Sequence, residues 1–226
     1  MNLSQEPARV HTVFFDVGGT LVRSPSFFDF MAERISPERC SEIADTLRTQ
    51  FMTMLRDESL PFATVKELLA CSFREIAETH DVPDLSHEAA RYYRECFTER
   101  AGLFDDVVPT LRYLRERGIR MIVISDADAD VLNEELILFG IRDFFEDFII
   151  SSEVRGYKPS APMVDAGRRL CRQPMAGNLL VGDNPVDVVT AGRMEIKAAL
   201  VRNSEEPGFQ AAYVFESLDE LRSIIP

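Results

Sequence analysis

Short apolar runs that predict strands alternate with helical patterns over most of the chain. These runs are 11–16, 119–125, 147–151, 178–182, 198–201 and 213–215. Between them, apolar spacing predicts helices over 105–117, 129–139 and 160–172, a short helix from residue 185, and a terminal helix that begins at the capping-box pattern 217–220. Gly118 and Gly140 directly follow two of the predicted helices, as is typical of helix C-termini. Strands alternating with helices predict an α/β fold, a Rossmann-like parallel sheet with helices on both faces.

The stretch 24–101 differs from the rest because it carries helical patterns only. Apolar positions follow helical spacing over 40–55, 65–76 and 89–97, and a further helix is expected over 26–35. The segment 64–67 (TVKE) is a capping-box pattern at the start of one of these helices. This block interrupts the strand–helix alternation just after the first strand. We therefore predict a core domain formed by 1–23 and 102–226, with an α-helical domain, 24–101, inserted into it.

Composition and charge narrow the class of protein. Of the 226 residues, 46% are hydrophobic, enough to bury a core. The formal net charge of −13 argues against a nucleic-acid partner. A small anionic substrate stays possible, because placed cations or a bound metal reverse the charge locally. No apolar run approaches the ~20 residues of a membrane span, and the first residues lack the apolar stretch of a signal peptide, so we expect no membrane partner and a cytoplasmic location.

The four cysteines, Cys40, Cys71, Cys96 and Cys171, are widely spaced and form no CxxC pair. This spacing does not support a zinc or redox site, and we expect reduced thiols packed in the interior.

Polar clusters follow four of the predicted strands. Asp16 comes after the first strand, 125–128 (SDAD) and 156–160 (GYKPS) after the next two, and 182–187 (GDNPVD) after the fourth. Ligands of open α/β sheets bind at the carboxyl ends of the strands. One such cluster often serves only as a turn or helix cap, but four in succession predict a site.

The residue types in these clusters favour phosphoryl transfer. Asp16 and Asp183 would converge, and two bare carboxylates repel unless a proton or cation lies between them. Oxygen ligands with no soft ligand favour Mg²⁺. Lys158 can balance the charge of a phosphoryl group, and Ser125 and the N–H groups of the Gly18–Gly19 turn can donate hydrogen bonds to it. A carboxylate nucleophile beside such a cation-rich hole suits phosphoryl transfer.

At these residues the sequence resembles the haloacid dehalogenase (HAD) superfamily. The segment 16–20 (DVGGT) is similar to the family's first motif, DxDGT, and Ser125 matches the serine or threonine of the second. Lys158 matches the lysine motif, and Gly182-Asp183 with Asp187 matches the fourth. The helical insert is similar to the family's small cap domain, so the resemblance covers nearly the whole chain.

The resemblance implies a role for each matched residue. Asp16 would be the nucleophile that forms an aspartyl-phosphate. Mg²⁺ would be held by Asp16, the backbone carbonyl of Gly18 and Asp183, with Asp187 supporting the metal directly or through water. Ser125 and Lys158 would act on the transferring group.

The phosphate-binding set inferred from these motifs also includes Gly19 and Asp126. The family often has asparagine where this chain has Asp126, and a carboxylate near a phosphate is unfavourable unless it turns away or is protonated. Capping of the following helix is the alternative role for this residue. The helical insert would close over the substrate and exclude water.

Gly18 departs from the phosphatase pattern. Phosphatases of this family usually carry a second Asp there, which protonates the leaving alcohol and later activates water. General acid–base help of this kind is typically worth ~10²–10⁴-fold in rate. His80 and His87 lie in the insert and are candidates to replace the missing acid, although a surface histidine at a helix end is the commoner case.

We therefore predict a Mg²⁺-dependent phosphohydrolase that acts on a small phosphorylated metabolite. The alternatives are a phosphonate hydrolase using Lys66, the only lysine of the insert, as a Schiff base, and a non-catalytic module that binds a phosphorylated ligand. Metal-free dehalogenation ranks lower, because dehalogenases of this family generally carry tyrosine at position 18 and lack the GD that this chain keeps at 182–183.

Overall fold

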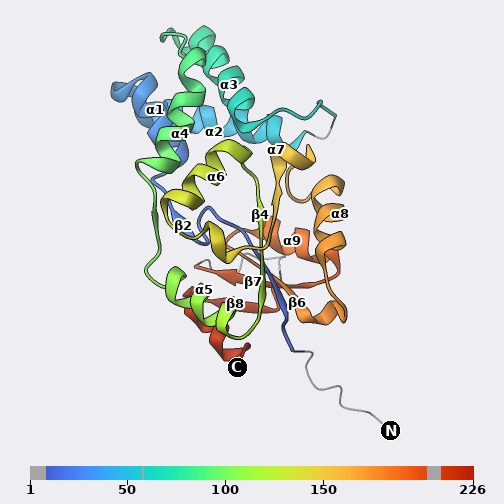
Figure 1. Ribbon diagram of the computed structural model, residues 1–226. Coiled ribbons are helices and arrows are strands. Elements are labelled where there is room, and N and C mark those ends of the chain that lie inside the picture. The colour runs from blue at the N-terminus through green and yellow to red at the C-terminus, as the bar shows by residue number, and fades with distance from the viewer. Residues whose placement is uncertain (1–8, 58, 203–209) are drawn as a thin grey trace. The chain divides into compact units, whose positions relative to one another are not determined.

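The computed structural model describes residues 9–57, 59–202 and 210–226, which form two compact units (Figure 1). The α/β unit comprises Met1–Arg23, Leu103–Asp126 and Phe139–Pro226, and the helical unit comprises Ser24–Gly102 and Ala127–Leu138. The contacts thus group Ala127–Leu138 with the helices of the insert. The domain boundaries drawn from the sequence, which leave this stretch in the core, stay a prediction.

A parallel sheet is the centre of the α/β unit. Within the described residues it has six strands, in the order β5 (Asp147–Ile150), β4 (Arg120–Ser125), β1 (Thr12–Phe15), β6 (Asn178–Gly182), β7 (Lys197–Val201) and β8 (Tyr213–Phe215). Neighbouring strands are parallel throughout this order. β1 lies between β4 and β6, so the residues that follow these three strands meet at one edge. The α/β fold predicted from the sequence is confirmed.

Apolar side chains of the sheet pack against helices. Phe14, Ile122 and Leu180 share one face and form a buried cluster with Met163 and Met194. Those two methionines belong to α8 (Ala161–Leu170) and α9 (Pro185–Met194), whereas α5 (Val107–Glu116) lies on the other side of the sheet (Figure 1). Successive residues of a strand point to opposite faces of the sheet. Because helices cover both faces, residues on both must be apolar, and the strands therefore appear in the sequence as continuous hydrophobic runs.

The predicted helix ends and the terminal helix can be compared directly with the structure. Gly118 and Gly140 adopt the left-handed conformation expected of helix C-termini, with φ of 68° and 67°. The terminal helix, Leu218–Ser223, is a 3₁₀ helix and begins with the predicted capping box of Ser217 and Glu220. A one-turn helix that the sequence did not indicate, α7 (Ser151–Val154), follows β5.

The helical unit contains the four helices expected in the insert and one from elsewhere in the chain. They are α1 (Phe27–Ile35), α2 (Cys40–Arg56), α3 (Val65–His80), α4 (Ala89–Thr98) and α6 (Ala129–Leu138). α1 packs on α2, α2 on α3, α3 on α4, and α4 on α6. Across the described ranges, no helix is both long and apolar enough to traverse a bilayer.

Two minor features complete the fold. Two short strands, β2 (Val22–Arg23) and β3 (Gly102–Leu103), pair with each other. All four cysteines are free; Cys96 is buried as expected, but Cys71 is exposed, so the prediction of interior thiols is wrong for that residue. Cys71 lies on the solvent side of α3, whereas the adjacent residues Ser72 and Phe73 lie on its buried face.

Candidate active site

Asp16 lies directly beyond β1, the strand flanked by β4 and β6. Its backbone N–H donates to the carbonyl of Val181 in β6, at 2.9 Å. Its side chain is almost fully buried. The turn that follows is closed by two hydrogen bonds to the carbonyl of Val17, from the N–H groups of Leu21 and Val22, each at 2.9 Å. The local sequence, apolar up to the carboxylate and glycine-rich after it, thus places one acid at the centre of the sheet edge.

Gly19 and Asp183 are in close contact. Gly19 has φ of 79°, and a Cβ built on it would lie 2.1 Å from a carboxylate oxygen of Asp183. This position therefore requires glycine for two reasons, backbone conformation and space. Gly18 differs: its φ is not positive, it is exposed, and a Cβ built there meets no atom within 4 Å from the described part of the chain.

Thr20 connects the two acids of the first and fourth motifs. Its buried hydroxyl lies 3.4 Å from Oδ2 of Asp16 and 3.4 Å from Oδ1 of Asp183. The carbonyl of Thr20 accepts a hydrogen bond from Nε of Arg202, at 3.4 Å, and the same guanidinium pairs with Asp106. The turn after β1 is thereby tied to the end of β7.

Lys158 forms the central ion pairs of the site. Its Nζ lies 2.7 Å from Oδ1 of Asp16 and 2.7 Å from Oδ1 of Asp187, and all three side chains are at least nine-tenths buried. Burial by itself lowers the pKa of Lys158, but the charges of Asp16, Asp187 and Asp126 raise it well above its ordinary value. Lys158 is therefore a fixed cation beside the nucleophile candidate.

Asp187 lies near the other acids and also accepts hydrogen bonds from two groups. It lies in the first turn of α9, where its Oδ2 accepts from the N–H of Asn184 at 3.1 Å and forms part of a capping box. Its Oδ1 accepts from Lys158. A Cβ built on Gly182 would collide with this carboxylate, at 2.2 Å, so the glycine before Asp183 allows the helix to begin this close to the strand.

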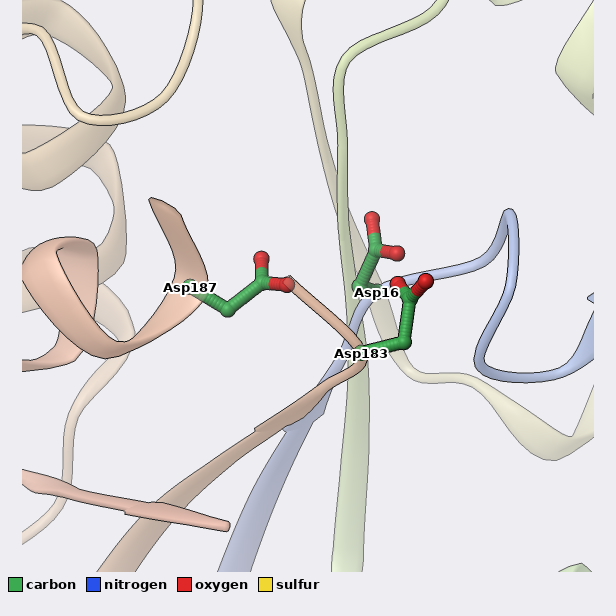
Figure 2. A group of neighbouring side chains, drawn as sticks. All are labelled: Asp16, Asp183 and Asp187. Atoms are coloured by element: carbon green, nitrogen blue, oxygen red, sulfur yellow. The ribbon is translucent and has the colours of Figure 1, made fainter. Parts of the chain in front are cut away.

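The carboxylates of Asp16, Asp183 and Asp187 converge (Figure 2). One oxygen from each lies within 4.8 Å of the others. Burial, and next the charge of Asp16, raise the pKa of Asp183 to about 7. Burial also raises the pKa of Asp187 to about 6, against the lowering effect of Lys158. Three acids with one lysine among them leave an excess of negative charge that favours a proton or a cation.

This donor set fits a hard divalent cation. The three converging groups offer carboxylate oxygens, and no cysteine or histidine is among them. Mg²⁺ prefers such oxygens and usually keeps several waters. Each of the three carboxylates also accepts hydrogen bonds from the protein, so the ligand set expected from the sequence stays a prediction.

Ser125 is the last residue of β4, the strand next to β1 in the sheet, and Asp126 follows it. Ser125 is buried at the end of the strand. Oδ1 of Asp126 accepts a hydrogen bond from the backbone N–H of Lys158 at 2.8 Å. Neither of the roles considered from the sequence, phosphate binding and capping of the following helix, predicts this contact. Burial raises the pKa of Asp126 to about 7, although Lys158 acts in the opposite direction. Asp126 thus holds the backbone of the lysine whose side chain reaches Asp16.

Lys66 and His80 lie at opposite ends of α3 in the helical unit. Nζ of Lys66 contacts both oxygens of Asp130, at 2.8 Å and 2.7 Å, and lies 3.8 Å from Asp128. His80, at the far end of the helix, has its ring nitrogens 2.7 Å and 3.4 Å from the hydroxyls of Thr79 and Thr46. Each candidate from the insert already has partners within its own unit. His87 is mostly exposed, 3.6 Å from Glu88.

The structure brings most of the predicted site residues together. Asp16, Lys158, Asp183 and Asp187 form one connected cluster, with Gly19 against Asp183 and Asp126 on the backbone of Lys158. Thr20 is the residue to which the sequence analysis assigned no role. Its signal was present, since it is the hydroxyl residue that closes the DVGGT motif four positions after Asp16.

Curated relatives of this chain include phosphohydrolases. It is 23% identical to pyrophosphatase PpaX of Bacillus cereus (strain B4264) over 194 residues, 85% of this chain and 83% of the relative. It is 30% identical to glyceraldehyde 3-phosphate phosphatase of Methanopyrus kandleri over 134 residues, 54% of this chain and 57% of the relative.

Solved structures share the whole fold. The L-2-haloacid dehalogenase RSc1362 matches with a TM-score of 0.80 at 21% identity, covering 96% of this chain and 99% of that chain. The magnesium-bound HAD-hydrolase YfnB of Bacillus subtilis matches with a TM-score of 0.76 at 16% identity, covering 96% and 99%. The sequence-family model of the haloacid dehalogenase-like hydrolases matches residues 10–194, a range that includes Asp16, Lys158, Asp183 and Asp187. With this match added to the fold and the acid cluster, the chain belongs to the haloacid dehalogenase-like hydrolase family and is a hydrolase.

Proposed function

We propose that this hydrolase is a Mg²⁺-dependent phosphohydrolase of a small phosphorylated metabolite, working through an aspartyl-phosphate on Asp16. The observation that carries the proposal is the buried cluster at the sheet edge, where Lys158 pairs with Asp16 while Asp183 lies within 4.8 Å. The names of the two relatives, a pyrophosphatase and a phosphatase, support the same reaction class. The cytoplasmic location and the closing of the helical unit over the substrate stay predictions.

The residues have separate tasks in this reaction. Asp16 attacks phosphorus, a bond forms between its carboxylate oxygen and phosphorus, and the bond to the leaving oxygen breaks. Lys158 is held beside Asp16 by Asp187 and by Asp126, so its charge is in place before the phosphoryl group arrives. Ser125 and the N–H of Gly18 donate to the phosphoryl oxygens. The N–H of Gly19, which the sequence assigned to the same task, instead donates to the carbonyl of Val22 at 2.8 Å, because it closes the turn after β1. Bound Mg²⁺, held by Asp16, Asp183 and the carbonyl of Gly18 with Asp187 in support, would neutralise negative charge on these oxygens.

The alternative reactions find less support. A Schiff base on Lys66 requires a neutral amine, whereas its Nζ is paired with both oxygens of Asp130. Metal-free dehalogenation does not explain why the chain has a second carboxylate, Asp183, within 4.8 Å of Asp16. The likeness to a dehalogenase at 21% identity concerns the fold. A module that only binds a ligand has no need of a nucleophile at the centre of the sheet edge.

The test is phosphate release from a panel of pyrophosphate, acetyl phosphate, p-nitrophenyl phosphate and alkyl phosphates, with Mg²⁺ and with EDTA. We expect release only with Mg²⁺, and none from Asp16→Asn, because the amide cannot form the acyl-phosphate. Circular dichroism of the variant serves as the folding control. Release by the wild-type protein no higher than by Asp16→Asn would favour the binding module, and full activity in EDTA would exclude the metal role.

A further inference from the structure

The position two residues after Asp16 is open space. Gly18 is exposed, and a Cβ built on it meets no atom within 4 Å from the described residues. This is the place where phosphatases of the family carry their acid, and no described side chain comes within 4 Å of the position that its Cβ would take. The glycine is also not required by the backbone, because its φ is not positive. Position 18 therefore lacks a functional group, although the cluster of Asp16, Lys158, Asp183 and Asp187 beside it is complete.

The two half-reactions of the proposed function depend differently on that missing group. In the first, Asp16 forms its bond to phosphorus and the leaving oxygen departs with the electron pair; a weakly basic leaving group needs no proton. In the second, a water oxygen bonds to phosphorus, the bond from the Asp16 oxygen to phosphorus breaks, and its electron pair returns to the carboxylate. The water must also lose a proton, and a positioned base normally speeds this step by ~10²–10⁴-fold.

The other carboxyl groups near Asp16 are engaged elsewhere. Asp187 accepts from Lys158 and from the N–H of Asn184, and Asp126 accepts from the N–H of Lys158. Asp183 is packed against Gly19 and Thr20 and belongs to the candidate metal site. None of these three comes within 4 Å of a Cβ built on Gly18, and each has the partners just named. The first half-reaction therefore keeps its machinery while the second lacks a base.

We propose that attack of water on the aspartyl-phosphate limits turnover, so that the phosphorylated enzyme accumulates, and that the open space at Gly18 admits a small carboxylate that acts as the missing base. The inference rests on the proposed function. It further assigns the substrate class: phosphoanhydrides, acyl phosphates and aryl phosphates, whose leaving groups depart without a proton. Alkyl phosphates are poor substrates, because their first half-reaction also lacks its acid.

The experiment follows p-nitrophenyl phosphate with Mg²⁺ after rapid mixing. We expect a burst of p-nitrophenolate close to one per enzyme molecule, followed by slow turnover. Acid quenching and intact-protein mass spectrometry should then find the mass of one added phosphoryl group, and peptide mapping should place it on Asp16. Formate or acetate should accelerate the slow phase and lower the phosphorylated fraction, whereas chloride at the same ionic strength should not.

Gly18→Asp is the matched variant. A Cβ at position 18 meets no described atom within 4 Å. We expect no burst, no trapped phosphoryl group, turnover raised by up to about 10²-fold, and no response to acetate. Gly18→Ala, which adds volume without a base, should not reproduce the gain in turnover of Gly18→Asp. Should Gly18→Asp fail to fold, acetate rescue of the wild-type protein still decides.

The possible results separate the two proposals. Turnover by the wild-type protein without a burst or trapped phosphoryl group, while Asp16→Asn is inactive, would overturn this inference and leave the proposed function standing. An acetate effect equal to that of chloride would also overturn it. No phosphate release above that of Asp16→Asn would overturn both.

Discussion

Adjacent glycines in the turn after Asp16 have opposite structural requirements. Gly19 has φ of 79° and lies so close to Asp183 that a Cβ would be 2.1 Å from its carboxylate. Gly18 has neither constraint. At the scale of single residues, one glycine is thus required by conformation and packing, whereas the other reflects the absence of a functional side chain.

Alanine at these two positions should therefore have different effects. Gly18→Ala should change the free energy of unfolding by less than about 1 kcal/mol, because its backbone suits any residue and its surroundings are open. Gly19→Ala should lower the free energy of unfolding by about 1–2 kcal/mol, because alanine is strained in the left-handed conformation. Its Cβ should also displace Asp183. Urea titration of both variants measures this, and equal losses would show that the turn is constrained at Gly18 as well.

The protonation of Asp126 should make stability depend on pH. Burial raises the pKa of Asp126 in the folded protein to about 7, above its ordinary value of 3.8, so the folded state keeps a proton that the unfolded chain loses. Stability should therefore fall as pH rises from about 4 to about 7, and level off above that range. The pKa values of Asp183 and Asp187 are also raised, so these groups change the stability in the same direction.

The measurement is urea unfolding in EDTA between pH 5 and 8, comparing wild-type protein with Asp126→Asn. The variant keeps an amide oxygen for the N–H of Lys158 but has no titrating group, so its stability should fall less steeply across this range. A variant with the same slope as the wild-type protein would mean that Asp126 is ionised in the folded state throughout.

At the scale of elements, the start of α3 is held by residues from two segments. The N–H of Glu67 donates to Thr64, and the N–H of Thr64 donates back to Glu67 at 2.7 Å, the capping box expected from the sequence. The N–H groups of Val65 and Lys66 donate to Asp128, at 2.9 Å and 3.1 Å. Asp128 precedes α6 in the chain, so this contact joins α6 to the helical unit and satisfies the helix donors that the box leaves over.

Removal of Asp128 should therefore destabilise the helical unit. Asp128→Ala leaves two N–H groups without their acceptor, and the side chain is 2% exposed, so we expect a loss of about 1–3 kcal/mol. Asp130→Ala is the control: it breaks the ion pair with Lys66, but the Asp130 side chain is 70% exposed, and the loss should stay below about 1 kcal/mol. Hydrogen exchange at Val65 and Lys66 locates the effect, and similar losses in both variants would contradict it.

At the scale of the whole molecule, a strongly acidic chain has a buried acid cluster in its α/β unit. The net charge is −13, and three carboxylates converge at the sheet edge, where Lys158 pairs with two of them, Asp16 and Asp187. The chain passes between the two units at 23–24, 102–103, 126–127 and 138–139. The third of these points lies directly after Ser125 and Asp126, so the end of β4, which holds two predicted phosphate-site residues, leads straight into a connection between the units.

Magnesium should stabilise the protein specifically through the acid cluster. At a concentration about 100-fold above its dissociation constant, Mg²⁺ should add about 2.7 kcal/mol to the free energy of unfolding. Sodium chloride at equal ionic strength is the control, because any salt screens the repulsion of so acidic a chain. Asp183→Asn should lose the magnesium-specific part. A shift that persists in this variant, or that sodium chloride reproduces, would count against the metal site.

The sequence by itself determined the order and type of most elements of this protein. Alternating strands and helices, Gly118 and Gly140 at helix ends, and the capping box at Thr64 all follow from patterns within a few residues, where local geometry decides. It also placed Asp16 and Asp183 after strands, because polar residues at the end of a buried run are visible in the chain. The family followed from their order together with Lys158, and the match over 10–194 confirms it.

Only the tertiary structure decided which of these residues touch. Strand order put β1 between β4 and β6, and the loop between α7 and α8 brought Lys158 between Asp16 and Asp187. The hydrogen bond from Lys158 to Asp126 and the grouping of α6 with the helical unit also depend on contacts between distant segments. The open space at Gly18 depends on them too, because the sequence shows that a side chain is missing but not whether another fills its place. Such contacts depend on side-chain direction and packing across elements, which no local pattern specifies.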